Sequence, residues 1–443
     1  MVGRRTLAWT LAGITAVLLS GCEQFDFFSS EEPPLPGKRI SIMTFNQSLE
    51  SDPALANLEV LLPKPYTNAD WSQAGGVPTH AMYHLELTDQ PREVWRVSIG
   101  DGSDDDRQVL AQPIVFGNRV FTMDSRSLIS AFDTSNGRVL WEVDLEIDEE
   151  DDGFFGGGLA FYNDRLFVTT GFGMVFALDA GNGNIVWSQQ VPGPMRAAPT
   201  VSGERVYVIT LDNRAFALAA DDGRRLWEHS GIQETAHLLG AASPAVAGST
   251  VIVPYSSGEI FSMLAENGRV LWTDGLSAIN RVDPIGDLAH IRGLPVIDRD
   301  VVLAVSHSGT MAAIDLRRGE RVWDAELGGV QMPWVAGDFI YLLTNDAQVV
   351  CLWRRDGRIR WVRPLPQFED PEDKEDPIRW VGPILAGNRL IIAGSHGVAV
   401  SISPYDGSPL GTIDLPGTPA VAPVIAERTL YFVMDDAELV ALR

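Results

Sequence analysis

The sequence predicts an all-β protein, an eight-bladed β-propeller whose ring is closed by a strand from near the N-terminus. Three observations predict it. A spacing of 28 residues recurs seven times between an apolar residue and a tryptophan or its substitute, and a glycine stands four residues before each end. A lone strand-like segment precedes the first repeat, and the last repeat has no fourth strand. Repeats of 40 to 50 residues with four strand-like segments are typical of propeller blades.

The repeats share a start, a glycine and an end. The spaced pairs are Pro113 and Trp141, Leu159 and Trp187, Pro199 and Trp227, Pro244 and Trp272, Pro295 and Trp323, Pro333 and Trp361, and Pro383 and Gly411. The glycines are Gly137, Gly183, Gly223, Gly268, Gly319, Gly357 and Gly407. The seventh repeat keeps the spacing and loses the tryptophan.

The first repeat shows how alternation and turn residues divide each unit. Strands are predicted over 113–115, 119–123, 128–133 and 138–143. The repeated glycine lies in the turn before the fourth strand, where a positive φ would penalise a Cβ. All variation in length falls in the connections from a fourth strand to the next first strand, at 142–158, 228–243, 273–294 and 362–382.

The eighth repeat begins at Pro423 and stops after its third strand. Val94 to Val97 has the pattern of a fourth strand with no third strand before it. Pairing of these two segments would close the ring and remove exposed sheet edges. We therefore expect the propeller to span residues 71–443.

The N-terminal segment has the features of a targeting signal. Arg4 and Arg5 precede an apolar run that is short for a membrane span, and the run ends in Leu19-Ser20-Gly21-Cys22. This ending resembles a bacterial lipobox, which implies a signal peptide over 1–21 and a lipidated Cys22; an ordinary signal peptide is the alternative. Residues 22–70, rich in proline and polar residues at first, are predicted to form a tether and a pre-propeller segment. In such lipoproteins an aspartate directly after the lipidated cysteine usually signals retention in the inner membrane. Glu23 stands at that position here, so the resemblance favours the outer membrane.

Charge and cysteine content narrow the functional classes. The net charge of −25 argues against binding nucleic acid or anionic lipid head groups. Much of the acid lies in runs at 101–106, 144–152 and 369–376, which are predicted to be solvated loops. The second cysteine, Cys351, occupies a repeat position held elsewhere by alanine or serine, so a structural role is expected.

Within the repeat, the pattern Ala-x-Asp-x-x-x-Gly-x-x-x-Trp is complete at 131–141, 177–187 and 313–323 and partial elsewhere. It resembles the tryptophan-docking motif of propellers of the pyrroloquinoline quinone (PQQ) dehydrogenase type. The resemblance implies that each tryptophan packs against the neighbouring blade, with its N–H available to a carbonyl. The structural docking residues are then Trp95, Trp141, Trp187, Trp227, Trp272, Trp323 and Trp361.

A lipobox followed by such a propeller resembles the BamB family of outer-membrane lipoproteins. The resemblance implies a non-enzymatic scaffold, anchored by lipid at the periplasmic face of the outer membrane and monomeric within the β-barrel assembly machinery. It would bind the periplasmic domains of BamA and other subunits, and would help nascent outer-membrane proteins to fold and insert. The Leu-Arg-Gly and Asp-x-Asp patterns associated with BamA docking are replaced here by Leu238-Leu239-Gly240 and by His290-Ile291-Arg292. The basic residue is gone from the first pattern and the acidic pair from the second, so either the interface charges are swapped or docking uses other contacts. Apolar residues on the two connections 228–243 and 273–294, edged by His290 and Arg292, suit a protein-binding patch, so we predict that Leu238, Leu239, His290, Ile291 and Arg292 contact a partner. The alternative is that the apolar residues pack under their own loops.

Two other functions are compatible with the fold. One is a scaffold lipoprotein of another envelope complex. The other is a PQQ-dependent dehydrogenase, but those enzymes use a disulfide between adjacent cysteines, and this sequence has no such pair. His80 and His84 lack a nearby carboxylate to complete a metal site, so packing roles are expected. The sequence thus predicts no catalytic residue, cofactor or metal.

Overall fold

The computed structural model describes residues 49–145, 156–234, 238–277 and 289–443. The chain divides into two units, of which the second, Glu50–Arg443, is compact. Cys22 lies outside the described residues, so its lipidation stays a prediction. The architecture below is that of the second unit.

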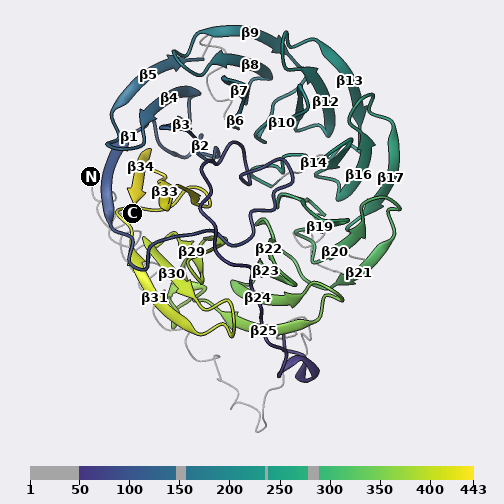
Figure 1. Cartoon of the computed structure of the whole chain (residues 1–443), viewed down its shortest axis with the longest axis vertical. Helices are drawn as coiled ribbons and strands as arrows, with labels where there is room; N and C mark the ends of the chain where they lie inside the picture. The colour runs from purple at the N-terminus through teal and green to yellow at the C-terminus, as the bar shows by residue number, and fades with distance from the viewer. Residues whose placement is uncertain (1–48, 146–155, 235–237, 278–288) are drawn as a thin grey trace, which may run out of the picture. The chain divides into compact units, whose positions relative to one another are not determined.

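Eight four-stranded antiparallel sheets surround a common centre and form the blades of a propeller, which confirms the predicted fold class (Figure 1). Blade one contains β2 (Ile114–Phe116), β3 (Arg119–Met123), β4 (Leu128–Asp133) and β5 (Val139–Asp144); blade two contains β6 (Gly157–Tyr162), β7 (Arg165–Thr170), β8 (Met174–Asp179) and β9 (Ile185–Gln190). Blade three contains β10 (Thr200–Ser202), β11 (Arg205–Ile209), β12 (Arg214–Ala219) and β13 (Arg225–Ser230); blade four contains β14 (Ala245–Ala247), β15 (Thr250–Pro254), β16 (Glu259–Leu264) and β17 (Val270–Gly275).

The remaining blades follow the same order from the inside outwards. Blade five contains β18 (Val296–Asp298), β19 (Val301–Val305), β20 (Met311–Asp315) and β21 (Arg321–Ala325); blade six contains β22 (Trp334–Ala336), β23 (Phe339–Leu343), β24 (Gln348–Trp353) and β25 (Ile359–Pro364). Blade seven contains β28 (Trp380–Ala386), β29 (Arg389–Gly394), β30 (Val398–Ile402) and β31 (Pro409–Asp414). An exposed acidic hairpin, β26 (Phe368–Asp370) and β27 (Glu375–Pro377), precedes blade seven, as expected for a solvated loop.

Blade eight is built from both ends of the unit. It contains β32 (Val424–Ala426), β33 (Thr429–Val433), β34 (Glu438–Leu442) and, as its outer strand, β1 (Glu93–Ser98). β1 pairs antiparallel with β34, with Trp95 opposite Ala441 and Val97 opposite Leu439. The prediction that Val94 to Val97 closes the ring is therefore confirmed.

The seven docking tryptophans hold consecutive blades together. Each indole N–H donates a hydrogen bond to a backbone carbonyl of the next blade, with distances of 2.8–3.2 Å. The acceptors are the carbonyls of Thr134, Ala180, Ala220, Ala265, Leu316, Arg354 and Pro404. The indole ring also lies over the turn glycine of that next blade.

Gly183 shows why the turn residue is a glycine. Its φ is +76°, a conformation that L side chains rarely adopt, and a Cβ there would lie 2.7 Å from the Trp141 ring. Turn geometry and blade packing therefore both require glycine, and only the turn geometry is predictable from the sequence.

The missing tryptophan of blade seven has a structural explanation. Gly411 occupies that position on β31, and nothing lies within 4 Å of where its Cβ would be. A tryptophan there would dock on the turn between the third and fourth strands of blade eight. No such turn exists, because blade eight takes its fourth strand from β1. The docking partner and the docking residue are absent together.

Residues 66–89, which we call the central segment, run inside the ring of first strands (Figure 1). A 3₁₀ turn, η1 (Pro53–Leu55), lies earlier in this unit. The first strand of each blade has an inner edge without a strand partner, and its unpaired N–H groups need acceptors. The central segment supplies such partners, which the sequence did not predict.

Its hydrogen bonds reach all eight blades. Backbone N–H groups donate from Val115 to the Trp71 carbonyl (2.9 Å), from Phe161 to Ser72 (2.6 Å), from Val246 to Pro78 (2.7 Å), from Ile297 to Thr79 (2.8 Å), from Gly387 to Leu85 (2.9 Å) and from Glu427 to Asn68 (2.8 Å). The Val201 N–H donates to Gln73 Oε1 (3.0 Å), and Trp334 Nε1 donates to the Tyr83 carbonyl (2.6 Å). One segment thus ties the inner edges of the blades together.

Candidate partner-binding site at the central funnel

The connections that enter the first strands surround a central cavity of about 1040 Å³, including the part open to solvent. We call it the funnel. All eight blades contribute residues to its wall, and its floor is formed by Trp71 and Ala74 of the central segment together with Trp334. The Trp71 and Trp334 rings are stacked, with centroids 6.5 Å apart. The central segment therefore forms part of the surface of the funnel.

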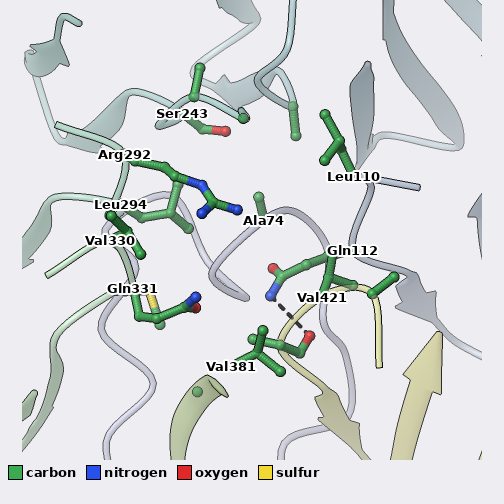
Figure 2. A pocket seen from close by; sticks show the side chains of 18 of the residues that line it. Ala74, Leu110, Gln112, Ser243, Arg292, Leu294, Val330, Gln331, Val381 and Val421 are labelled. Carbon is green, nitrogen blue, oxygen red and sulfur yellow. Dashed lines mark hydrogen bonds between the residues drawn. The ribbon is translucent and has the colours of Figure 1, made fainter. Parts of the chain in front are cut away.

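The wall of the funnel is mainly apolar. Its larger apolar side chains are Leu110, Leu239, Leu294, Val330, Met332, Val381 and Val421. Gln112 is tied into the wall, because its amide donates to the Ala422 carbonyl at 3.2 Å and accepts from the Gly75 N–H at 3.1 Å. Figure 2 shows Arg292 of blade five and Gln331 of blade six pointing into the cavity.

The charge of the funnel is opposite to that of the chain. Three arginines line it, Arg196, Arg292 and Arg379, and among the described residues no aspartate or glutamate does. The whole chain carries 59 acidic and 34 basic residues, so this is a local positive region in an acidic protein. Low-dielectric walls concentrate the field of such charges and favour anions inside.

The arginines are in different electrostatic situations. Arg379 donates to the Asp435 carboxylate at 2.8 Å and to the Pro419 carbonyl at 3.3 Å, so its charge is compensated. Burial, and then the charge of Arg379, lower the pKa of Arg292 from its usual value. Burial also lowers the pKa of Arg196. Within the described residues the Arg292 side chain has no hydrogen bond or ion pair, so it is the wall cation best placed to accept an external anion.

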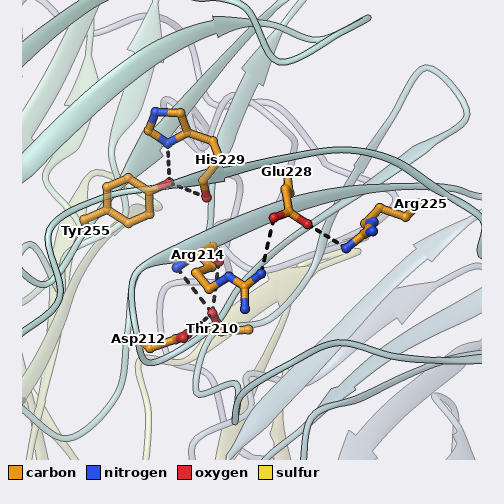
Figure 3. A network of polar contacts seen from close by, with 7 residues as sticks. All are labelled: Thr210, Asp212, Arg214, Arg225, Glu228, His229 and Tyr255. Carbon is orange, nitrogen blue, oxygen red and sulfur yellow. Dashed lines mark hydrogen bonds and ion pairs between the residues drawn. The ribbon is translucent and has the colours of Figure 1, made fainter.

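Described residues of two connections, 239–243 of the one at 228–243 and 292–294 of the one at 273–294, form the rim on one side, and Tyr255 contacts both connections. The Tyr255 hydroxyl lies 2.9 Å from His229 Nδ1 at the start of the first connection (Figure 3). The Tyr255 carbonyl accepts from the Ile291 N–H at 3.4 Å near the end of the second. Tyr255 is 1% exposed, so both connections are fixed to the interior of blade four.

The outer face of β13 carries an ion-pair network beside this anchor. Glu228 bridges Arg214 at 3.3 Å and Arg225 at 2.6 Å (Figure 3). All three side chains are partly exposed, and such pairs contribute little to stability. The network therefore orients the strand surface but does not fix the rim.

The two rim connections meet through Gly240 and Arg292. Gly240 has a φ of +86°, and a Cβ on it would lie 2.9 Å from Arg292 Nε. The absence of a side chain at Gly240 lets the guanidinium lie across the first connection. The final glycine of the Leu238-Leu239-Gly240 pattern thus positions Arg292.

The structure brings the five predicted partner-binding residues together but does not expose all of them. Leu238 and Leu239 are half-buried, and the Leu238 N–H donates to His290 Nδ1 at 3.1 Å. His290 is 2% exposed and Ile291 is 1% exposed within an apolar cluster, so a partner cannot reach their side chains in this arrangement. Leu238, Leu239 and Arg292 are the members that a partner can touch. The segments 235–237 and 278–288 of the same connections lie outside the described residues.

The other residues considered from sequence are structural in their surroundings. His80 Nδ1 lies 2.7 Å from the Pro295 carbonyl and His84 Nδ1 lies 2.8 Å from the Pro63 carbonyl; both rings are buried. Cys351 is buried opposite Trp361, and burial raises the pKa of its thiol. In the described parts of the chain, no three His, Cys, Asp or Glu side chains form a group suited to a metal ion.

Sequence reasoning did not find Arg196, Arg379 and Gln331 as funnel residues. A signal existed for Arg196 and Arg292, since each stands three residues before the proline that opens a repeat, Pro199 and Pro295. The ring turns this repeat position towards its axis. Reading that single position across all eight repeats would have identified part of the funnel wall.

The family model and the related sequences that match this chain all point to one family. The model of the family described as outer membrane protein assembly factor BamB matches residues 125–363. The BamB protein of Yersinia pestis is 29% identical over 276 residues, which cover 61% of this chain and 70% of that protein. In several other curated BamB proteins the match is shorter, and the chain spans 20–30% of their length.

Solved structures show the same fold at low identity. The crystal structure of BamB from Moraxella catarrhalis aligns with a TM-score of 0.68 and 20% identity, covering 80% of this chain and 100% of that one. The quinohemoprotein alcohol dehydrogenase of Comamonas testosteroni aligns with a TM-score of 0.63 and 14% identity, covering 84% and 80%. At such identities the likeness shows the fold alone, and it does not distinguish an assembly factor from a dehydrogenase.

Proposed function

This chain belongs to the family of the outer membrane protein assembly factor BamB, and we propose from that membership that it is a non-enzymatic scaffold of the β-barrel assembly machinery. In this proposal it binds the periplasmic domains of BamA and assists the folding and insertion of outer-membrane β-barrel proteins. A rigid ring closed by β1 and tied by the central segment suits a scaffold, because it presents a fixed surface to its partners.

The observation that carries the proposal is the funnel rim. Leu238 and Leu239 lie half-buried beside Arg292 on two connections that Tyr255 fixes in place. Apolar side chains edged by a polar or charged residue are typical of protein interfaces, and preorganised contacts cost less entropy on binding. We propose that Leu238, Leu239 and Arg292 contact BamA, while His290 and Ile291 support them from below.

The docking proposal predicts that Leu239→Asp or Arg292→Glu abolishes capture of BamA in a pull-down with the full-length protein. A carboxylate at position 239 would have to be desolvated in the interface, and a glutamate at position 292 would reverse a contact charge. Leu410→Asp is the matched control, because Leu410 lies on β31 and is 55% exposed. Melting temperatures should stay close to that of the unmodified protein.

Capture of BamA by both rim variants at the control level would place the docking surface elsewhere. Capture of a different envelope complex, with BamA absent, would favour the alternative of a scaffold for another machine.

The dehydrogenase alternative has only the fold in its favour. The two cysteines of the chain are Cys22 and Cys351, which are not adjacent, so the disulfide that PQQ enzymes use cannot form. Cys351 is also buried within blade six, away from the funnel wall. Stoichiometric retention of PQQ after reconstitution with calcium would contradict the non-enzymatic proposal.

We also propose that Cys22 carries the lipid that holds the protein at the periplasmic face of the outer membrane. Among the described residues no helix has the length and apolar character to cross a bilayer. Several acyl chains on one residue anchor stably where one chain alone is marginal. The protein extracted from membranes should have the mass of residues 22–443 plus a lipid, and Cys22→Ser should release it from the membrane fraction. A Cys22→Ser variant that stays in the outer membrane would contradict the anchor.

A further inference from the structure

The funnel has the chemistry of a ligand site of its own. Among the residues that the structure describes, three arginines and no carboxylates line it, in a chain with a net charge of −25. Arg292 points into the cavity and makes no ion pair within the described residues (Figure 2). Holding a half-buried cation near Arg379 without a counter-ion costs stability, which an anionic ligand would offset.

The rest of the wall restricts which anion fits. Leu239, Leu294, Val330 and Met332 line the same cavity as Arg292, together with Trp71. A small inorganic anion would leave these apolar surfaces in contact with water. The ligand should therefore combine an anionic group with apolar groups.

Gln331 adds a further requirement. Its side chain points into the cavity from blade six, and no described residue satisfies its amide donor or acceptor (Figure 2). A side-chain amide that offers both a donor and an acceptor matches a peptide group. A fatty acid has the carboxylate and the apolar chain but has no group that both donates to Gln331 and accepts from it.

We propose that the funnel binds an apolar peptide segment that carries a carboxylate, with the carboxylate at Arg292 and a peptide group at Gln331. The apolar side chains of the segment would contact Leu294, Val330 and Met332. The carboxylate could be a chain terminus or an acidic side chain, and both supply the same chemistry. The proposal does not depend on BamA docking, since it concerns the isolated protein.

The test measures fluorescence anisotropy of a short labelled peptide ending in two leucines, as the free acid and as the amide. An amidated peptide with a glutamate before the leucines tests a side-chain carboxylate. At least one carboxylate-bearing peptide should bind about tenfold or more tightly than the neutral peptide, and binding should weaken with salt. Arg292→Met should remove this preference, and Gln331→Val should weaken binding of all the peptides about threefold.

Arg224→Met is the matched control, because Arg224 lies on the turn before β13 with a 65% exposed side chain. A second readout separates a ligand residue from a structural one: Arg292→Met should keep or raise the melting temperature, since it removes a half-buried charge near another arginine. Equal binding of acid, glutamate and neutral peptides would overturn the proposal. Saturable binding of dodecanoate without any peptide binding would also overturn it.

Substitution of Gln331 tests peptide binding independently of BamA docking. The residue lies on blade six, outside the two rim connections, so Gln331→Val should reduce peptide binding while capture of BamA persists. If neither the unmodified protein nor any variant binds the peptides while BamA is still captured, only the ligand-site proposal is refuted. Loss of BamA capture with peptide binding intact would refute only the docking proposal.

Discussion

Replacing Trp272 with alanine should lower the free energy of unfolding by about 3–5 kcal/mol, which is typical when a large aromatic side chain is removed from a packed site. Trp272 on β17 is 8% exposed, its indole N–H donates to the Leu316 carbonyl at 2.8 Å, and its ring covers Gly319 of blade five. The substitution therefore removes both the packing and the hydrogen bond between blades four and five. Chemical denaturation followed by circular dichroism measures the effect.

Val270→Ala on the same strand is the matched control. Val270 is 41% exposed and its side chain is not in the blade interface, so its loss should change the free energy of unfolding much less. Similar effects of the two substitutions would show that the tryptophan does not couple the blades.

Shortening the chain from its N-terminus should first lower the stability of the protein and then, with further shortening, cause it to associate. A protein that begins at residue 50 keeps the whole second unit and should unfold like the full-length chain. A protein that begins at residue 90 loses the central segment, so first strands in all eight blades lose hydrogen-bond partners worth about 0.5–1.5 kcal/mol each. It should remain monomeric but melt at a clearly lower temperature.

A protein that begins at residue 99 also loses β1 and the pairing of β1 with β34. Its eighth blade then presents an open sheet edge, which favours association between chains. Size-exclusion chromatography should detect oligomers of this protein only. Ring closure by β1 would be contradicted if the protein starting at residue 99 were a monomer with the same melting temperature as the protein starting at residue 90. The role of the central segment would be contradicted if the proteins starting at residues 50 and 90 were equally stable.

The sequence by itself determined the ring. A constant spacing and seven turn glycines predicted eight blades, because a repeated unit must bury the same surfaces against each neighbour. The first repeat already gave β3 and β4 with their observed bounds, 119–123 and 128–133. The sequence also showed that Gly411 stands where the other repeats have a tryptophan. The cause of this substitution, the absent turn of blade eight, became evident only from the strand order.

Only the tertiary structure decided what lies inside the ring. The central segment has no repeat and no alternation, since its hydrogen bonds go to eight different blades instead of to one neighbouring strand, and local pattern cannot reveal such contacts. The funnel arginines come from separate blades, so their convergence depends on the closed ring. Burial also divided the predicted interface, leaving Leu238, Leu239 and Arg292 accessible while His290 and Ile291 pack inside. Periodicity in sequence records contacts that recur, whereas a site at the axis is made of contacts that occur once.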